Sequence, residues 1–171
     1  MHARGVIKGV WAGAGARVPR QGEDGETGDS QAPATWDLGW AYYTGAESSC
    51  APYATADKRA SNYGTLSTTE GLESTAKANE QIMAALVSGQ NALKYSSYDS
   101  SAVTAAYNSV LQGIQATYIQ ASIRYAYKMD IDLKQGLSFQ EHRGEGWGYW
   151  RVVEPYIAAK DSAGAQGVTD M

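Results

Sequence analysis

The sequence has little of what several common classes of protein need. Its 171 residues include a single cysteine, Cys50, so an internal disulfide cannot form. The net charge is −4 and no basic patch is visible, which argues against a nucleic-acid partner because such proteins neutralise phosphates with Lys and Arg. No apolar run approaches the ~20 residues that a membrane-spanning helix needs. The length favours one ordinary domain with a real core.

Histidine and phenylalanine are also scarce. The two histidines are His2 and His142, and with only His142 in the body of the chain we do not expect a His-dependent hydrolase. The sequence shows no nucleophile–base pattern, P-loop or dinucleotide fingerprint, so we expect a protein that is not an enzyme. Phe occurs once and Tyr twelve times. This imbalance indicates an interior with many hydroxyl groups to satisfy, or a tyrosine-rich binding surface.

The two ends of the chain differ in composition from its middle. Residues 1–20 are basic and rich in Gly and Ala, and residues 21–30 are acidic. Neither segment can bury enough apolar surface to offset the entropy of ordering it, and no compact apolar region typical of a secretory signal is clear. We expect residues 1–33 to be a disordered tail, a processed leader or sequence upstream of a partial gene model. Residues 161–171 are predicted to be a flexible C-terminal tail.

Two short helices are predicted first. One follows Pro33 and ends at Gly45, which sits where a C-cap residue would. The other is opened by Pro52 and ended by Gly64.

Three longer helices are expected after these, over about residues 67–95, 99–129 and 138–159. Ser67 and Glu70 have the spacing of a capping box, and Asp99 is placed as an N-cap residue. No segment alternates convincingly with period two. The predicted fold class is therefore all-α, a bundle of three long and two short helices in a domain over residues 34–160.

The last predicted helix contains QEHRGEGWGYW, residues 140–150. On a helix His142 and Glu145 share one face, Glu141 is adjacent to Glu145, and Tyr149 lies one turn further along. His and Glu at i and i+3 match the spacing of metal ligands in helical bundles, and an imidazole with carboxylate and phenolate oxygens suits Fe3+. These residues are candidate iron ligands. The alternative is an exposed His–Glu face without a metal.

Glycines and tryptophans alternate in the same stretch. Gly144, Gly146 and Gly148 each cost about 1 kcal/mol relative to Ala inside a helix. We expect close helix contact or close approach of a ligand to offset this cost. Trp147 and Trp150 form an opposing stripe that can pack the helix down or, with other exposed aromatics, dock a partner.

Other candidate residues lie earlier in the chain. Lys58 and Arg59 can hold an anion such as carbonate, since Arg suits bidentate oxyanion binding; the alternative is ion pairs that lock the second helix. Tyr42 and Tyr43 can supply phenolate ligands or an aromatic docking surface, and the alternative is that each is a half-buried tyrosine.

Four segments occur in an order seen in one protein family: WAYYTGAES, PYATADKRASNYGT, KANEQIMAALVSGQNAL and EHRGEGWGYWRVVEPYI. Its specific elements are A-[DE]-K-R-x-x-N-[FY]-G-T, here Ala56 to Thr65, and HxxEGxxYWR, here His142 to Arg151. Over about residues 34–159 the chain resembles the algal Fe-assimilating proteins, the low-iron-inducible (high-CO2-inducible) periplasmic proteins, whose domain recurs in phytotransferrin-like iron-uptake proteins. The HxxE element is also similar, over a few residues, to the GxHxxE motif of imelysin-like periplasmic proteins.

The resemblance implies an α-helical protein of the periplasm, the cell surface or the secreted fraction that captures iron rather than catalysing a reaction. Family members commonly carry cysteines where this chain has Ala60 and Leu66, which leaves Cys50 unpaired. Two hypotheses follow. The first is an iron-binding protein, with iron as its cofactor or cargo. The second is a metal-free structural module that docks to copies of itself or to a larger assembly.

Overall fold

The structure, a computed structural model, describes residues 32–94 and 98–170. The predicted leader or tail over residues 1–33 lies outside the described residues except for its last two, which begin the first helix. The described helices are α2 (Ala32–Thr44), η1 (Ser48–Cys50, a 3-10 turn), α3 (Pro52–Tyr63), α4 (Lys77–Ala92), α5 (Ser100–Lys134), α6 (Gln140–Ala158) and α7 (Ser162–Thr169).

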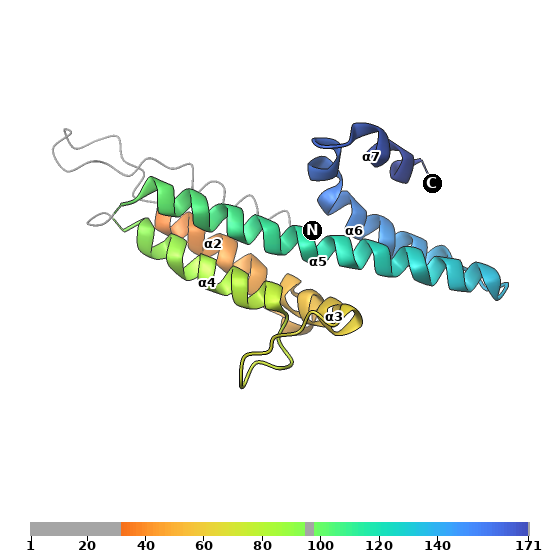
Figure 1. The fold of residues 1–171 in the computed structure, drawn as a ribbon, viewed down its shortest axis with the longest axis horizontal. Coiled ribbons are helices and arrows are strands. Elements are labelled where there is room, and N and C mark those ends of the chain that lie inside the picture. The colour runs from red at the N-terminus through yellow and green to blue at the C-terminus, as the bar shows by residue number, and fades with distance from the viewer. Residues whose placement is uncertain (1–31, 95–97, 171) are drawn as a thin grey trace. The chain divides into compact units, whose positions relative to one another are not determined.

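The predicted all-α class is confirmed, with long helices α4, α5 and α6 (Figure 1). Extended pairing among the described residues is limited to one bridge between Leu66 and Ala76. The chain divides into two compact units after Ile114. The first unit holds α2, α3, α4 and the start of α5, and the second holds the rest of α5 with α6 and α7. No helix in the described ranges is long and apolar enough to cross a membrane.

Local sequence signals fix several helix ends. Gly45 and Gly64 follow α2 and α3 with positive φ angles of 70° and 64°, the left-handed conformation that glycine adopts without a steric cost. Pro52 begins α3, where its missing N–H removes no helical hydrogen bond. The Asp99 carboxylate accepts hydrogen bonds from Ser101 and Ala102 N–H at 2.9 and 3.0 Å, which confirms its predicted role at the start of α5.

The predicted capping box of Ser67 and Glu70 is wrong. Helix α4 begins at Lys77, and Ser67 Oγ instead accepts a hydrogen bond from Thr69 N–H at 2.9 Å within a turn. Ser67 N–H donates to Thr75 O at 2.7 Å and Lys77 N–H donates to Thr65 O at 3.1 Å, so the loop closes on itself by backbone pairing. This pairing satisfies the backbone groups that a helix over the same residues would have used.

A buried polar network ties α2, α3 and α4 together. Asn79 is fully buried; its amide accepts a hydrogen bond from Tyr43 Oη and donates to Tyr53 O at 3.0 Å and Asp57 Oδ1 at 2.7 Å. The same Asp57 oxygen accepts a hydrogen bond from Ala76 N–H at 2.7 Å. Ala76 is the N-cap residue of α4 and makes no side-chain cap of its own. Asp57 therefore supplies, from α3, an acceptor that the start of α4 lacks locally.

Trp36 sets the spacing between α2 and α4 in the first unit. Its ring is fully buried, and its Nε1–H donates to Leu86 O at 2.9 Å. The ring lies on Gly89, where a Cβ would come within 2.0 Å of Trp36 Cζ2. A similar contact joins α4 to α5, because a Cβ at Gly113 would lie 2.6 Å from Ile82 Cγ1. Both glycines are therefore required by close helix packing.

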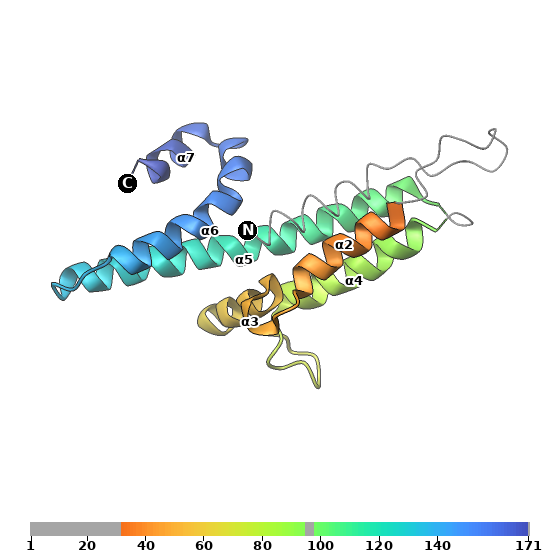
Figure 2. The same ribbon diagram turned by 180° about the vertical axis from the view of Figure 1, so that it is seen from behind.

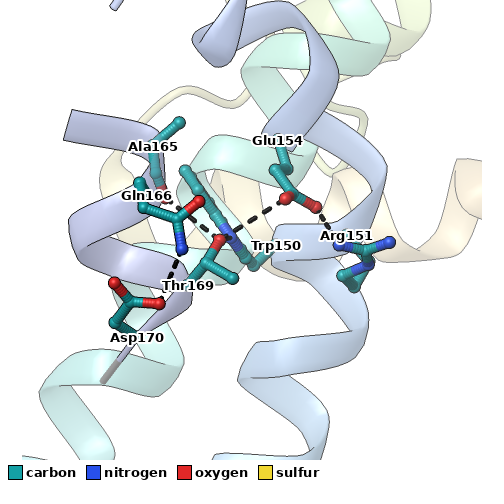
Figure 3. Close-up of polar contacts among 7 residues, drawn as sticks. All are labelled: Trp150, Arg151, Glu154, Ala165, Gln166, Thr169 and Asp170. Atoms are coloured by element: carbon teal, nitrogen blue, oxygen red, sulfur yellow. Dashed lines mark hydrogen bonds and ion pairs between the residues drawn. The ribbon is translucent and has the colours of Figure 1, made fainter. Parts of the chain in front are cut away.

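The C-terminal segment differs from the predicted tail. Ser162–Thr169 form α7, and its N-cap residue Asp161 accepts a hydrogen bond from Gly164 N–H at 2.8 Å. Trp150 Nε1–H donates to Thr169 Oγ1 at 3.2 Å, and Thr169 also contacts Glu154 (Figure 3). These contacts join α7 to α6. The predicted flexible tail is therefore corrected for residues 162–169.

Gly89→Ala tests the packing of Trp36. We expect the free energy of unfolding to fall by about 1–3 kcal/mol, because the rigid indole ring has to move away from the new methyl group. Gly148→Ala is the matched control, since nothing lies within 4 Å of a Cβ there. This control is expected to stabilise the protein by up to about 1 kcal/mol through helix propensity. Urea denaturation followed by circular dichroism measures both; equal effects of the two variants would contradict the packing argument.

Candidate metal centre between helices α5 and α6

A tight turn brings the start of α6 back along the end of α5. Gly136 has a φ of 66°, its N–H donates to Leu133 O at 3.2 Å, and Leu137 N–H donates to Asp132 O at 2.8 Å. This pair of hydrogen bonds is a Schellman motif, which ends a helix and reverses the chain. Figures 1 and 2 both show α6 lying beside the later part of α5. Residues ten or more positions apart in sequence therefore face one another.

His142 is held by one residue of α5 at each ring nitrogen. Its Nδ1 lies 2.6 Å from Asp132 Oδ2, and its Nε2 lies 3.4 Å from Lys128 Nζ. The Asp132 carboxylate is almost wholly buried, since the residue is 8% exposed. A carboxylate at Nδ1 fixes the ring orientation and favours a proton on that nitrogen, which leaves the lone pair of Nε2 directed at the lysine.

Three tyrosines, two from α5 and one from α6, form a row of ring contacts that starts at His142. The Tyr125 ring lies 5.9 Å from the His142 ring and stacks on Tyr149 at 5.4 Å, and the Tyr149 ring lies 5.8 Å from Tyr118. Lys128 Nζ lies 5.0 Å from the centre of the Tyr125 ring, a cation–π distance. We call this group the α5–α6 seam; its residues are Tyr118, Tyr125, Lys128, Asp132, His142 and Tyr149.

The structure brings two of the four predicted metal ligands together. His142 and Tyr149 lie in the seam, whereas Glu141 and Glu145 are exposed. The reason is the register of α6: positions 142, 146, 149 and 153 are buried or partly buried and form a stripe with a spacing of three and four residues, beside the buried Trp150. In that register the two glutamates fall outside the packed stripe. Within residues 32–94 and 98–170, no group of three or more His, Cys, Asp or Glu side chains is placed to hold a metal ion.

Tyr118, Tyr125, Lys128 and Asp132 are the seam residues that the sequence did not single out. Asp132 lies beyond Met129, where the predicted helix ended, and its contact with His142 crosses the turn between helices. A usable signal exists on α5, because Tyr118, Tyr125 and Asp132 recur every seven residues on one face. Extending that stripe to Asp132 and folding the next helix back onto it would have placed the carboxylate beside His142.

The three glycines of α6 have different surroundings. A Cβ at Gly146 would lie 3.0 Å from Tyr125 Cβ, so the expected close helix contact is confirmed there. Nothing lies within 4 Å of a Cβ at Gly144 or Gly148, and the expectation of close helix contact is wrong for both.

The predicted anion-binding residues belong to the first unit. Lys58 is exposed and its Nζ lies 3.4 Å from Ser49 O, and Arg59 is partly buried on the same helix, α3. They are therefore not members of the seam, and their role in binding an anion stays a prediction.

Two of the four predicted interface residues are exposed. Tyr42 is 42% and Trp147 is 44% exposed, and Arg151 lies over the Trp147 ring at 5.7 Å. Tyr43 and Trp150 are only 1% and 9% exposed because their polar atoms bind Asn79 and Thr169 inside the chain. The prediction that these two dock a partner protein is corrected, since both side chains are largely buried within the fold.

Burial changes the ionisation of one seam tyrosine. The pKa of Tyr118 is raised far above its ordinary value, first by burial and second by the neighbouring Tyr149. Its phenol therefore stays protonated under physiological conditions, which makes Tyr118 a poor phenolate donor.

Comparison of the chain with protein-family models, with curated proteins and with solved structures found no match.

The raised pKa of Tyr118 predicts a specific loss of stability in alkali. Above pH 10 the phenol ionises in the unfolded chain but resists ionisation in the folded one, so the free energy of unfolding falls as the pH rises. We expect Tyr118→Phe to flatten this fall relative to wild type. Urea denaturation at a series of pH values from 8 to about 11 measures it. Identical pH slopes for the two proteins would show that Tyr118 is not shielded.

Proposed function

We propose that this protein binds ferric iron at the α5–α6 seam and acts in iron capture at the cell surface, in the periplasm or in the secreted fraction. The observation that carries the proposal is the Asp132–His142 pair, whose Oδ2 and Nδ1 atoms lie 2.6 Å apart beside Tyr125 and Tyr149. The family resemblance supplies the metal and the expected location.

The donor chemistry of the seam suits a hard, highly charged cation. Fe3+ favours carboxylate and phenolate oxygens and accepts imidazole nitrogen, and the seam contains all three kinds of group. Asp132 has a different role: by accepting a hydrogen bond from His142 Nδ1–H it orients the ring and leaves the lone pair of Nε2 for the metal. We therefore assign His142 Nε2 and the phenol oxygens of Tyr125 and Tyr149 as the donors, with Asp132 orienting the imidazole.

Lys128 supports the proposal in an indirect way. Its ammonium group lies 3.4 Å from His142 Nε2 and over the Tyr125 ring, so this position already attracts a positive charge. Lysine has a flexible four-carbon stem and a compact charge, so its head group can move into solvent at a modest cost. Under this proposal the Lys128 ammonium group competes with the metal ion for the position next to His142 Nε2.

The ligand assignment is tested by titrating the full-length protein with Fe3+ in the presence of bicarbonate. We expect one equivalent to produce a visible tyrosinate-to-iron absorption band. His142→Ala and Tyr149→Phe are expected to lower the affinity at least tenfold, because each removes a donor. Glu145→Gln and Glu141→Gln are the matched controls from the same helix and are expected to change the affinity less than twofold.

Each outcome of this titration decides between ligand sets. Loss of the band in Glu145→Gln but not in Tyr149→Phe would replace the seam with a site built on the exposed glutamates. Loss in none of the variants would remove α6 from the site altogether. Circular dichroism of every variant establishes that it is folded.

Lys128 offers a second test, in which the substitution is expected to raise the affinity for Fe3+ instead of lowering it. We expect Lys128→Gln to raise the affinity for Fe3+ by about tenfold, because the competing charge is removed while the stem length is largely kept. The measurement is competition against a chelator of known iron affinity. A fall in affinity would show that Lys128 assists the bound state, for example by pairing with an anion, and would contradict its role as a competitor.

A second candidate function is a metal-free docking module that assembles with copies of itself or with a larger complex. The observation that favours it is that His142 has a partner at both ring nitrogens without any metal, so the seam also works as a polar lock between helices. Absence of iron binding by the folded wild-type protein, together with self-association in analytical ultracentrifugation, would establish this function in place of the first.

A further inference from the structure

Helices α5, α6 and α7 enclose an open groove of about 580 Å³ in the second unit. Its volume lies within the range of about 300–1,000 Å³ that is typical of small-molecule sites. None of the six seam residues lines the groove. The groove is therefore distinct from the candidate metal centre, although both lie along α6.

The groove has apolar walls and a side without side chains. Met129, Trp147, Trp150 and Val168 supply large apolar surfaces. Gly144 also lines the groove, and nothing lies within 4 Å of a Cβ built there. A glycine in a helix interior costs about 1 kcal/mol relative to Ala, and no neighbouring side chain requires this one. The space beside Gly144 is therefore available to a ligand.

Charge in the groove is confined to one place. Arg143 is the only charged residue among those that line it. Arg143 is exposed, and none of the ion pairs found among the described residues involves it. A guanidinium group binds carboxylates and similar oxyanions through paired hydrogen bonds.

The part of the groove near Trp150 and Thr169 does not favour an anion. There Thr169 Oγ1 accepts a hydrogen bond from Trp150 Nε1 and lies 3.4 Å from Glu154 Oε1 (Figure 3). The polar atoms of Trp150 and Thr169 already have partners, and the Glu154 carboxylate lies next to Thr169. Arg143 and Trp150 are seven residues apart on α6, which corresponds to about 10 Å along the helix axis. An anionic group is thus favoured at the Arg143 end, and an apolar chain is favoured toward Trp150.

We propose that the groove binds a small amphipathic organic anion. The oxyanion head group pairs with Arg143, and the apolar body passes Gly144 and lies against Trp147, Trp150 and Met129. This proposal does not depend on iron binding, because no groove residue is a proposed donor to the metal.

The test uses isothermal titration of the full-length, metal-free protein with dodecanoate below its micelle-forming concentration. Dodecanol, which has the same chain without the charge, is the ligand control. We expect saturable binding of one dodecanoate, at least tenfold tighter than binding of dodecanol. Arg143→Gln is expected to reduce the affinity for dodecanoate to that for dodecanol.

Two glycine variants test the location. Gly144→Leu puts a side chain into the groove and is expected to weaken dodecanoate binding at least tenfold. Gly148→Leu is the matched control, because Gly148 has equally open surroundings on the same helix but does not line the groove. Both replacements favour the helix, so both variants are expected to fold. Absence of saturable binding, equal effects of the two leucines, or equal affinity for dodecanoate and dodecanol would each overturn the proposal.

Discussion

Helix α5 supplies a stripe of buried residues to each unit. Its buried positions recur every three or four residues, but their chemistry changes along the helix. Up to Ile114 the stripe is aliphatic, with Val103 and Val110 nearly inaccessible to solvent. From Tyr118 onward its buried residues are Tyr118, Ala121, Tyr125 and Asp132. The first unit is therefore stabilised mainly by apolar burial, whereas the second depends on ring packing and satisfied polar groups, because buried hydroxyls and carboxylates are costly without partners.

This change of chemistry explains why the seam is the candidate site. A tyrosine-lined helix contact needs hydrogen-bonding groups in its interior, and those groups are the ones that a hard cation recognises. Asp132 and Lys128 each contact a ring nitrogen of His142, so the three side chains join α5 to α6 at the position proposed for the cation. Under the proposed function, fold stability and iron binding depend on the same side chains, and binding of iron replaces the contacts that His142 makes with Lys128.

The helix ends that could be predicted from the sequence are those set by residues close to them in the chain. Gly45, Gly64 and Asp99 end or begin helices through contacts within a few residues, and all three roles are confirmed. The predictions failed where distant residues decide the outcome. The loop after α3 is held by its own backbone pairing and by Asp57, so no capping box forms at Ser67. Asp132 was missed because its contact with His142 spans the turn between α5 and α6. Helix α7 was missed because it is short, contains Gly164 and Gly167, and buries only Ala165.

In the proposed iron site, Nε2 of His142 binds the metal and Nδ1–H of His142 donates a hydrogen bond to Asp132. Nitrogen NMR of the His2→Gln variant, labelled with 15N-histidine, observes that ring alone, because His142 is then the only histidine. Titration with Ga3+, a diamagnetic ion of the same charge as Fe3+, separates the two nitrogens. One equivalent of Ga3+ is expected to shift the Nε2 resonance and to leave the proton on Nδ1. An unchanged Nε2 resonance in a folded protein with excess Ga3+ would contradict the proposed iron site.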